Sequence, residues 1–411
     1  MTGASRVHFL LFVSAGALAP ACAFIYDFPD EVVESSTGVA AGGSNQGGGD
    51  QGGGGFMGGG GCAFVVPAPE SVAFAPKSDS EGTYIGGVIR HEGQTFVHGN
   101  FGGNLLGYPG QFPPNPTLIS YMARIDDGAP DAEILGTVTT CAPTIGVLAT
   151  YRAIMVDDIP VGVGSIPSTS TVTGTVPTEV HFDRAGTGSP CGQGNGFVLQ
   201  DDDVTNNGHS PYIAGFRGVE APDVRFSDGV HAILLDAAWA GGDVVAMGIG
   251  YGQAWGANFG DEQLFRYHLV RFSGDQALAP IDAVPIDIWA DASLFSQGGN
   301  EAAASVTVDD TGTAWATGGE CMGGDDSCET SSSFFLTRWG PTDQAATQAI
   351  AGSDMNRASF GSAIEYANDK LVIAGGYAGT LSGTALPAAT ADMDPFVIAV
   401  SRDDPKNTLW A

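Results

Sequence analysis

Short apolar runs alternate with polar positions along most of the chain after residue 62, and Gly, Asp, Asn or Pro ends each run. In the run from Val306 to Val308 every second side chain is apolar, which is the period of a strand with one buried face. The turn formers Asp309-Asp310-Thr311-Gly312 follow, with a glycine available for a positive φ. A second apolar run then ends at Gly318. This pattern, without a convincing amphipathic helix, predicts an all-β fold of short antiparallel strands.

The strand, turn and strand ending in Gly recur as a unit. The copies cover residues 88–99, 153–164, 232–248, 306–318 and 363–375. A second apolar half-unit follows four of them, at residues 119–126, 267–273, 334–340 and 395–402. For the second repeat the best candidate is 180–184, and residues 212–216 are a candidate sixth repeat. Each repeat is long enough for a four-stranded sheet with its loops, and such periods are typical of propellers or solenoids.

The last repeat carries a family resemblance. It contains the apolar strand Phe396 to Val400, then Arg402-Asp403-Asp404, and the closing pair Leu409-Trp410. This arrangement resembles the β-propeller repeats of bacterial secreted and surface proteins, best over 360–410, less well over 300–345 and poorly over 140–230. The resemblance implies a propeller, often at the cell surface, and no particular activity.

Five repeats and one candidate sixth repeat predict an all-β propeller of about five or six four-stranded blades over residues 62–411. A strand from residues 63–66 or 72–74 is expected to complete the last blade, because closure removes an open sheet edge. The alternative architecture is a pair of β-sandwiches.

Residues 1–21 read as a secretory signal peptide. Arg6 precedes an apolar stretch at 7–13, and small residues lead to Cys22. The stretch is too short to span a bilayer by itself. Residues 18–22 resemble a bacterial lipoprotein signal, in which the cysteine is lipidated, although Ala19 stands where that family has a large aliphatic residue. We therefore expect lipidation at Cys22 and a place in the bacterial cell envelope, with cleavage and secretion without a lipid as the alternative.

Residues 22–61 form the second segment, a disordered Gly-rich linker. From 37 to 61 nearly every residue is Gly, Ala, Ser, Asn, Gln or Asp, so few side chains can be buried to offset the entropy of ordering. A coil of roughly 25 residues has an end-to-end distance on the order of 25–30 Å. Such a linker would hold the folded part clear of a membrane.

The charge of the chain excludes some partners. Lys and Arg number 15 against 46 Asp and Glu, a net charge of −31. Nucleic-acid binding needs clustered basic residues, and anionic membrane surfaces attract the same groups. We expect no nucleic-acid partner, membrane contact only through a lipid on Cys22, and an extracellular protein or glycan as the partner.

The six cysteines suggest disulfides in an exported protein. Cys321 and Cys328 flank a short Gly/Asp loop and predict a disulfide that closes a hairpin, with a zinc half-site as the alternative. Cys141 and Cys191 are the next pair. Cys62 is left unpaired if Cys22 is lipidated, and could pair with Cys22 if it is not.

Candidate chemistry is sparse. Of the acidic clusters, Asp201, Asp202 and Asp203 are the best Ca²⁺ candidates, although Asp is also a common turn residue. We expect no other cofactor. The seven histidines are isolated, with His91 and His98 on either side of one turn.

No catalytic motif is present, so no residue is assigned a catalytic role. The sequence favours a non-enzymatic surface binding or interaction module. The alternatives are an extracellular polysaccharide hydrolase or lyase with acids in the propeller funnel, and a purely structural envelope protein.

Overall fold

All five predicted hairpins are present as antiparallel strand pairs in the computed structural model. The structure describes residues 83–101, 119–126, 133–140, 149–167, 170–171, 174–175, 178–184, 197–199, 209–218, 223–226, 230–259, 265–275, 277–289, 304–321, 332–350, 359–381, 386–390 and 393–411. The segments expected to form a signal peptide and a Gly-rich linker lie outside these residues. Within them, every regular element is a strand, so the all-β prediction is confirmed.

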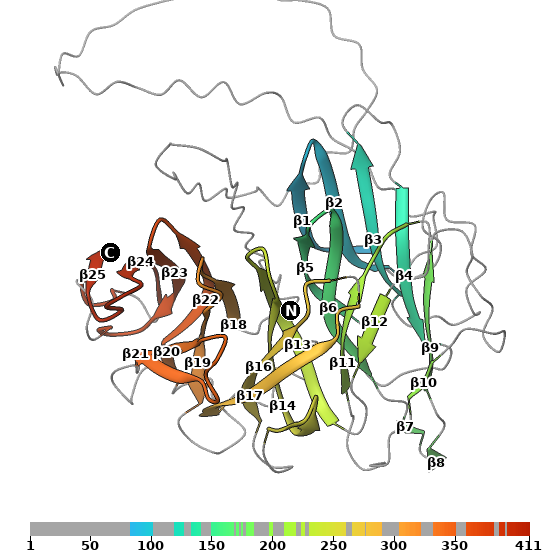
Figure 1. Ribbon diagram of the computed structural model, residues 1–411. Helices are drawn as coiled ribbons and strands as arrows, with labels where there is room; N and C mark the ends of the chain where they lie inside the picture. The colour runs from blue at the N-terminus through green and yellow to red at the C-terminus, as the bar shows by residue number, and fades with distance from the viewer. Residues whose placement is uncertain are drawn as a thin grey trace, which may run out of the picture. The chain divides into compact units, whose positions relative to one another are not determined.

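The first two larger sheets are built from the N-terminal half of the described chain (Figure 1). The first has the order β1 (Thr83–His91), β2 (Gln94–Phe101), β3 (Ile119–Asp126), β4 (Glu133–Thr140), β9 (Thr178–Arg184) and β10 (Phe197–Leu199). The second has the order β12 (Asp223–Phe226), β11 (His209–Gly215), β6 (Ile159–Pro167) and β5 (Ala149–Val156). Two short strands, β7 (Ser170–Thr171) and β8 (Gly174–Thr175), pair only with each other.

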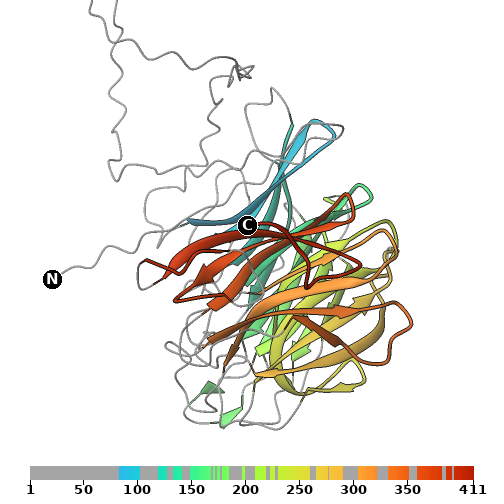
Figure 2. The ribbon, with the colours of Figure 1, turned by 90° about the vertical axis from the view of Figure 1, so that its left-hand side faces the viewer.

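The other three larger sheets follow in chain order. The third contains β13 (Val230–Trp239), β14 (Val244–Ala254), β16 (Arg266–Phe272) and β17 (Pro280–Trp289), with β15 (Ala257–Asn258) on β14. The fourth contains β18 (Ala304–Val308), β19 (Ala314–Cys321), β20 (Ser332–Trp339) and β21 (Thr347–Ile350). The fifth contains β22 (Ser359–Ala367), β23 (Lys370–Tyr377), β24 (Asp394–Ser401) and β25 (Thr408–Trp410). The orange fourth and red fifth sheets lie beside each other in Figure 2.

Two strand assignments made from the sequence are wrong. Residues 180–184 belong to β9, which pairs with β4 in the first sheet. Residues 212–215 belong to β11, which pairs with β6 and β12 and is thus the third strand of the second sheet, not part of a sixth repeat. All seven β11 side chains are buried. A strand buried on both faces loses the alternation by which the sequence could have identified it.

The last sheet is completed from within the C-terminal repeat. Its fourth strand is β25, which pairs with β24 through Trp410 and Thr408. The expectation that an N-terminal strand takes this place is therefore corrected, and residues 63–66 and 72–74 lie outside the described residues.

Apolar side chains fill the spaces between successive sheets. One cluster joins the first and second sheets through Phe96 and Tyr212, and the next joins the second and third through Val163 and Leu234. Two further clusters join the third to the fourth sheet and the fourth to the fifth. Each of the three middle sheets is therefore buried on both faces, as in face-to-face stacked sheets.

The first strand of four of the five larger sheets has a β-bulge. The register shifts lie at Ile85/Gly87, Thr150/Arg152, Leu234/Asp236 and Gly361/Ala363. A bulge inserts one residue and redirects the side chains that follow it. Because these first strands contact one another from sheet to sheet, the bulges decide which polar groups meet there.

Candidate functional site

Most residues selected from the sequence lie outside the described residues. These are Cys22, Cys62, Cys141, Cys191, Cys328, Asp201, Asp202 and Asp203. Cys321 is the last residue of β19, where its backbone pairs with Ser332 of β20. Lipidation, the disulfides and Ca²⁺ binding at Asp201–Asp203 therefore stay predictions.

Asp236 joins three sheets. It follows the bulge of β13, and its side chain is only 9% exposed. Oδ1 accepts the Ala237 N–H at 2.9 Å and lies 3.2 Å from Nε of Arg152, on β5 of the second sheet. Oδ2 accepts the Ser305 hydroxyl at 2.6 Å and the Val306 N–H at 2.9 Å, both on β18 of the fourth sheet. The two oxygens therefore accept three hydrogen bonds and take part in one ion pair, so both are engaged inside the fold.

Ser305 extends this contact to the fifth sheet. While its hydroxyl donates to Asp236, its oxygen accepts the N–H of Ile364 on β22 at 3.3 Å. Glu365, the next residue, interacts electrostatically with Arg152 and Asp236. We call Arg152, Asp236, Ser305 and Glu365 the inner-strand cluster, since they come from the first strands of four successive sheets.

Two members of the inner-strand cluster are open to solvent. The Arg152 side chain is 59% exposed, and Glu365 is also exposed. Partial loss of water around the Glu365 carboxyl raises its pKa, Arg152 lowers it, and Asp236 raises it further. The cluster therefore presents one guanidinium and one carboxyl group whose protonated form is favoured relative to a free glutamate.

His98 is buried beside this cluster. It lies on β2 opposite Gly87, where a Cβ would stand 2.4 Å from its Nε2. Burial and, to a smaller extent, the charge of Arg152 lower the pKa of His98 to about 4, against a hydrogen bond with Thr150 that raises it. His98 is therefore neutral at pH 7 and has a packing role.

Three hydroxyl groups connect the first and second sheets. Ser120 of β3 is hydrogen-bonded to the Thr150 hydroxyl of β5, which is 2.6 Å from the Tyr212 hydroxyl of β11. The Thr150 N–H donates to the Ser120 oxygen at 3.1 Å. All three residues are buried, and burial raises the pKa of Tyr212. This chain of neutral groups satisfies polar atoms inside the fold.

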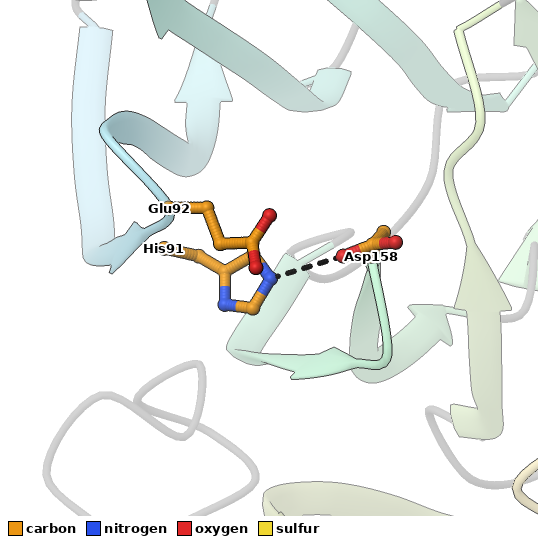
Figure 3. A group of neighbouring side chains, drawn as sticks. All are labelled: His91, Glu92 and Asp158. Atoms are coloured by element: carbon orange, nitrogen blue, oxygen red, sulfur yellow. Dashed lines mark hydrogen bonds and ion pairs between the residues drawn. The ribbon is translucent and has the colours of Figure 1, made fainter.

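A second polar group lies at the turns of the first two hairpins (Figure 3). His91 ends β1, Glu92 begins the turn to β2, and Asp158 lies in the turn between β5 and β6. His91 Nε2 is 3.3 Å from Asp158 Oδ1, and one ligand atom of each of the three residues lies within 4.8 Å of the others. We call His91, Glu92 and Asp158 the tip triad.

The fourth and fifth sheets have a different group at their hairpin turns. Arg402, after β24, donates from Nη1 to Asp310 at 2.6 Å, and its Nη2 is 3.3 Å from Asp369. Nη1 also donates to the Tyr366 hydroxyl at 3.1 Å. We call Arg402, Asp310 and Asp369 the arginine clamp.

Only part of these groups can be recognised in the sequence. His91 was noted beside its turn, and Asp310 within a turn sequence. Arg152, Asp236 and Glu365 were missed, because each is an isolated charge in a strand and only the approach of different sheets brings them together. The alternating pattern predicts the strands, but not the bulges that place Arg152 and Asp236.

Comparisons with known proteins do not assign the chain to a family. No family model matches, and no curated protein matches. One solved structure that is similar is Trypanosoma rangeli sialidase in complex with sialic acid, at 10% identity and a TM-score of 0.24. The match covers 81% of this chain and 59% of that chain, so it spans less than two thirds of the sialidase. A likeness this distant assigns neither activity nor ligand.

In the part of the chain that the structure describes, no helix has the length and apolar character needed to cross a membrane.

Proposed function

We propose that the chain is an extracytoplasmic β-propeller of about five blades, anchored by a lipid on Cys22, and that it binds a glycan. The stacked order of five antiparallel sheets, with an apolar cluster between each successive pair, supports the propeller. The inner-strand cluster supports the binding role, because it brings polar groups of four sheets together.

The hydrogen bonds of Asp236 favour binding over hydrolysis. Glycoside cleavage normally uses two carboxyl groups that face the same bond, one as acid and one as base or nucleophile. Asp236 accepts hydrogen bonds from Ala237, Ser305 and Val306 and is ion-paired with Arg152, so its oxygens are engaged in holding the sheets together. Glu365 is then left without a second free carboxylate in the cluster, which is the observation that carries the proposal.

Arg152 and Glu365 favour one class of ligand. Nε of Arg152 lies 3.2 Å from Asp236 Oδ1, and the Arg152 side chain is 59% exposed, so the guanidinium is accessible to a ligand. A guanidinium can hold a carboxylate through two parallel hydrogen bonds, while a carboxyl group bonds to sugar hydroxyls. We therefore infer that the ligand is a polysaccharide that contains uronic acids.

Binding is tested with the full-length chain and a panel of acidic and neutral polysaccharides. Wild type should bind an acidic member, and Arg152→Gln should weaken that binding by about tenfold, the loss expected for one charge-assisted hydrogen-bonded pair. Arg266→Gln is the matched control, since Arg266 pairs with the exposed Asp287 on β17. Equal binding by wild type and Arg152→Gln, or no binding to any acidic member, would contradict the assignment.

A second candidate is a polysaccharide hydrolase that uses Glu365 as its acid. The raised pKa of Glu365 favours this candidate, because a carboxyl group that holds its proton more strongly than a free glutamate is better suited to donate that proton to a leaving group. Release of reducing ends by wild type and not by Glu365→Gln would support hydrolysis. Unchanged polymer length in the presence of measurable binding would support the binding module.

The anchor is tested separately. Metabolic labelling with palmitate should mark wild type and leave Cys22→Ser unlabelled. Equal labelling of both proteins would remove the lipid from the proposal without changing the binding site.

A further inference from the structure

The tip triad combines ligand types that first-row transition metals prefer. It offers one imidazole nitrogen and two carboxylates from hairpins of two different sheets. Imidazole suits Zn²⁺, Cu²⁺ and Ni²⁺, whereas Ca²⁺ and Mg²⁺ prefer oxygen ligands throughout. The histidine therefore distinguishes the triad from a hard-cation site.

The distances fit a single ion. Zn²⁺ binds nitrogen and oxygen at roughly 2.0–2.2 Å in tetrahedral geometry, which places neighbouring ligand atoms about 3.4 Å apart. His91 Nε2 and Asp158 Oδ1 are 3.3 Å apart. The Glu92 carboxylate lies beside the imidazole ring in Figure 3, within the 4.8 Å that includes all three ligand atoms. Glu92 is exposed, so its side chain is free to turn toward the metal.

The arginine clamp shows how the chain neutralises acidic side chains in the hairpin turns of two other adjacent sheets. There, two hairpin-turn carboxylates of adjacent sheets, Asp310 and Asp369, share the guanidinium of Arg402. In the described part of the chain, neither Glu92 nor Asp158 pairs with an arginine or lysine, and the partner of Asp158 is His91. The tip triad thus has two carboxylates without the fixed cation that the arginine clamp contains.

We propose that His91, Glu92 and Asp158 bind one Zn²⁺ ion that bridges the hairpin turns of the first and second sheets. Three protein ligands leave a fourth position of a tetrahedral ion for water or for a donor group from outside the chain. The Asp158 side chain is 84% exposed, so the ion can enter directly from solvent.

Co²⁺ is the probe, since its visible absorption reports the ligands and geometry. Titration of the full-length wild-type chain should give saturable binding of one ion with nitrogen and oxygen ligands. His91→Gln and Asp158→Asn should each weaken this binding by about tenfold or more, and Zn²⁺ should displace the Co²⁺. Asp310→Asn, a change of an exposed hairpin-turn acid in the arginine clamp, is the matched control and should bind like wild type.

A second measurement separates a lost ligand from a damaged fold. Far-ultraviolet circular dichroism should be the same for all four proteins, and added Zn²⁺ should raise the thermal midpoint of wild type and Asp310→Asn only. Equal Co²⁺ affinity of wild type, His91→Gln and Asp158→Asn would overturn the proposal. So would the absence of saturable binding, or absorption from cysteine ligands that persists in both variants.

Discussion

The contact between the first and second sheets and the contact between the fourth and fifth sheets use different polar groups. The first contact contains the buried His98, the hydroxyl chain of Ser120, Thr150 and Tyr212, and the tip triad at its outer end. The second contains Thr317 packed on Gly361, Ser359 bonded to the Phe334 N–H, and the arginine clamp.

This difference determines how the two contacts respond to solution conditions. A histidine can take up a proton in acid and can bind metals, whereas an arginine keeps its charge at all accessible pH values. The contact between the first and second sheets should therefore depend on pH and divalent metal. The contact between the fourth and fifth sheets should depend mainly on salt.

The largest expected effect is acid destabilisation through His98. Its pKa is about 4 in the fold and 6.5 as the ordinary value, so only the unfolded chain takes up this proton as the pH falls from 6.5 to 4. Stability from this group is complete above pH 6.5 and decreases toward pH 4, by about 3 kcal/mol in all. Urea unfolding of wild type and His98→Gln at pH 7 and pH 4.5 measures the difference.

The control for this prediction lies in the other contact. Thr317→Val removes a buried hydroxyl that donates to the Phe335 carbonyl, and its free-energy change should be the same at both pH values. Parallel pH dependence of wild type and His98→Gln would show that His98 is protonated in the folded chain.

Single hydroxyl groups should have the next largest effect, and a similar one in both contacts. Tyr212→Phe removes the last member of the hydroxyl chain, and Ser359→Ala leaves the buried Phe334 N–H without its acceptor. Each change should lower the free energy of unfolding by about 1–3 kcal/mol, the cost of a buried polar group that loses its partner. Chemical denaturation at pH 7 measures both. A neutral result for Tyr212→Phe alone would show that the Ser120 and Thr150 hydroxyls satisfy each other.

The smallest expected effect is that of the arginine clamp. Arg402→Gln removes ion pairs of exposed acids, which are weak and screened by salt. Its thermal midpoint should fall slightly below that of wild type in dilute buffer and equal it at high salt. A difference that persists at high salt would indicate that packing of Arg402 on Tyr366 is more important than charge.

Local patterns in the sequence predict the hairpins, and they do so well. Alternation and turn residues identify all five, and Gly312 has the positive φ that its turn requires. Strands that pair at long range were harder to assign: β9 joins β4 across the inserted β5 and β6, and β11 shows no alternation. Those errors arise because pairing partners far apart in sequence leave no local signal.

The candidate sites were less predictable than the fold. Arg152 and Glu365 are separated by more than 200 residues, and each is an ordinary charge in its own strand. Their proximity depends on bulges and on the stacking of sheets. The tip triad was partly visible, because His91 adjoins a predicted turn, but Asp158 becomes its neighbour only when two hairpins lie side by side.

The hydrogen bonds and the ion pair of Asp236 also affect how the chain unfolds under mechanical force. In an array whose neighbours meet only through apolar side chains, a terminal unit can detach while the others stay folded. Asp236 instead holds β5 through Arg152 and β18 through Ser305 and Val306. If the chain is pulled from its two ends, the contacts among the second, third and fourth sheets are loaded together at one carboxylate. These three sheets should then rupture together in a single extension step, whereas the fifth sheet has further contacts with the fourth at Ser359 and in the arginine clamp.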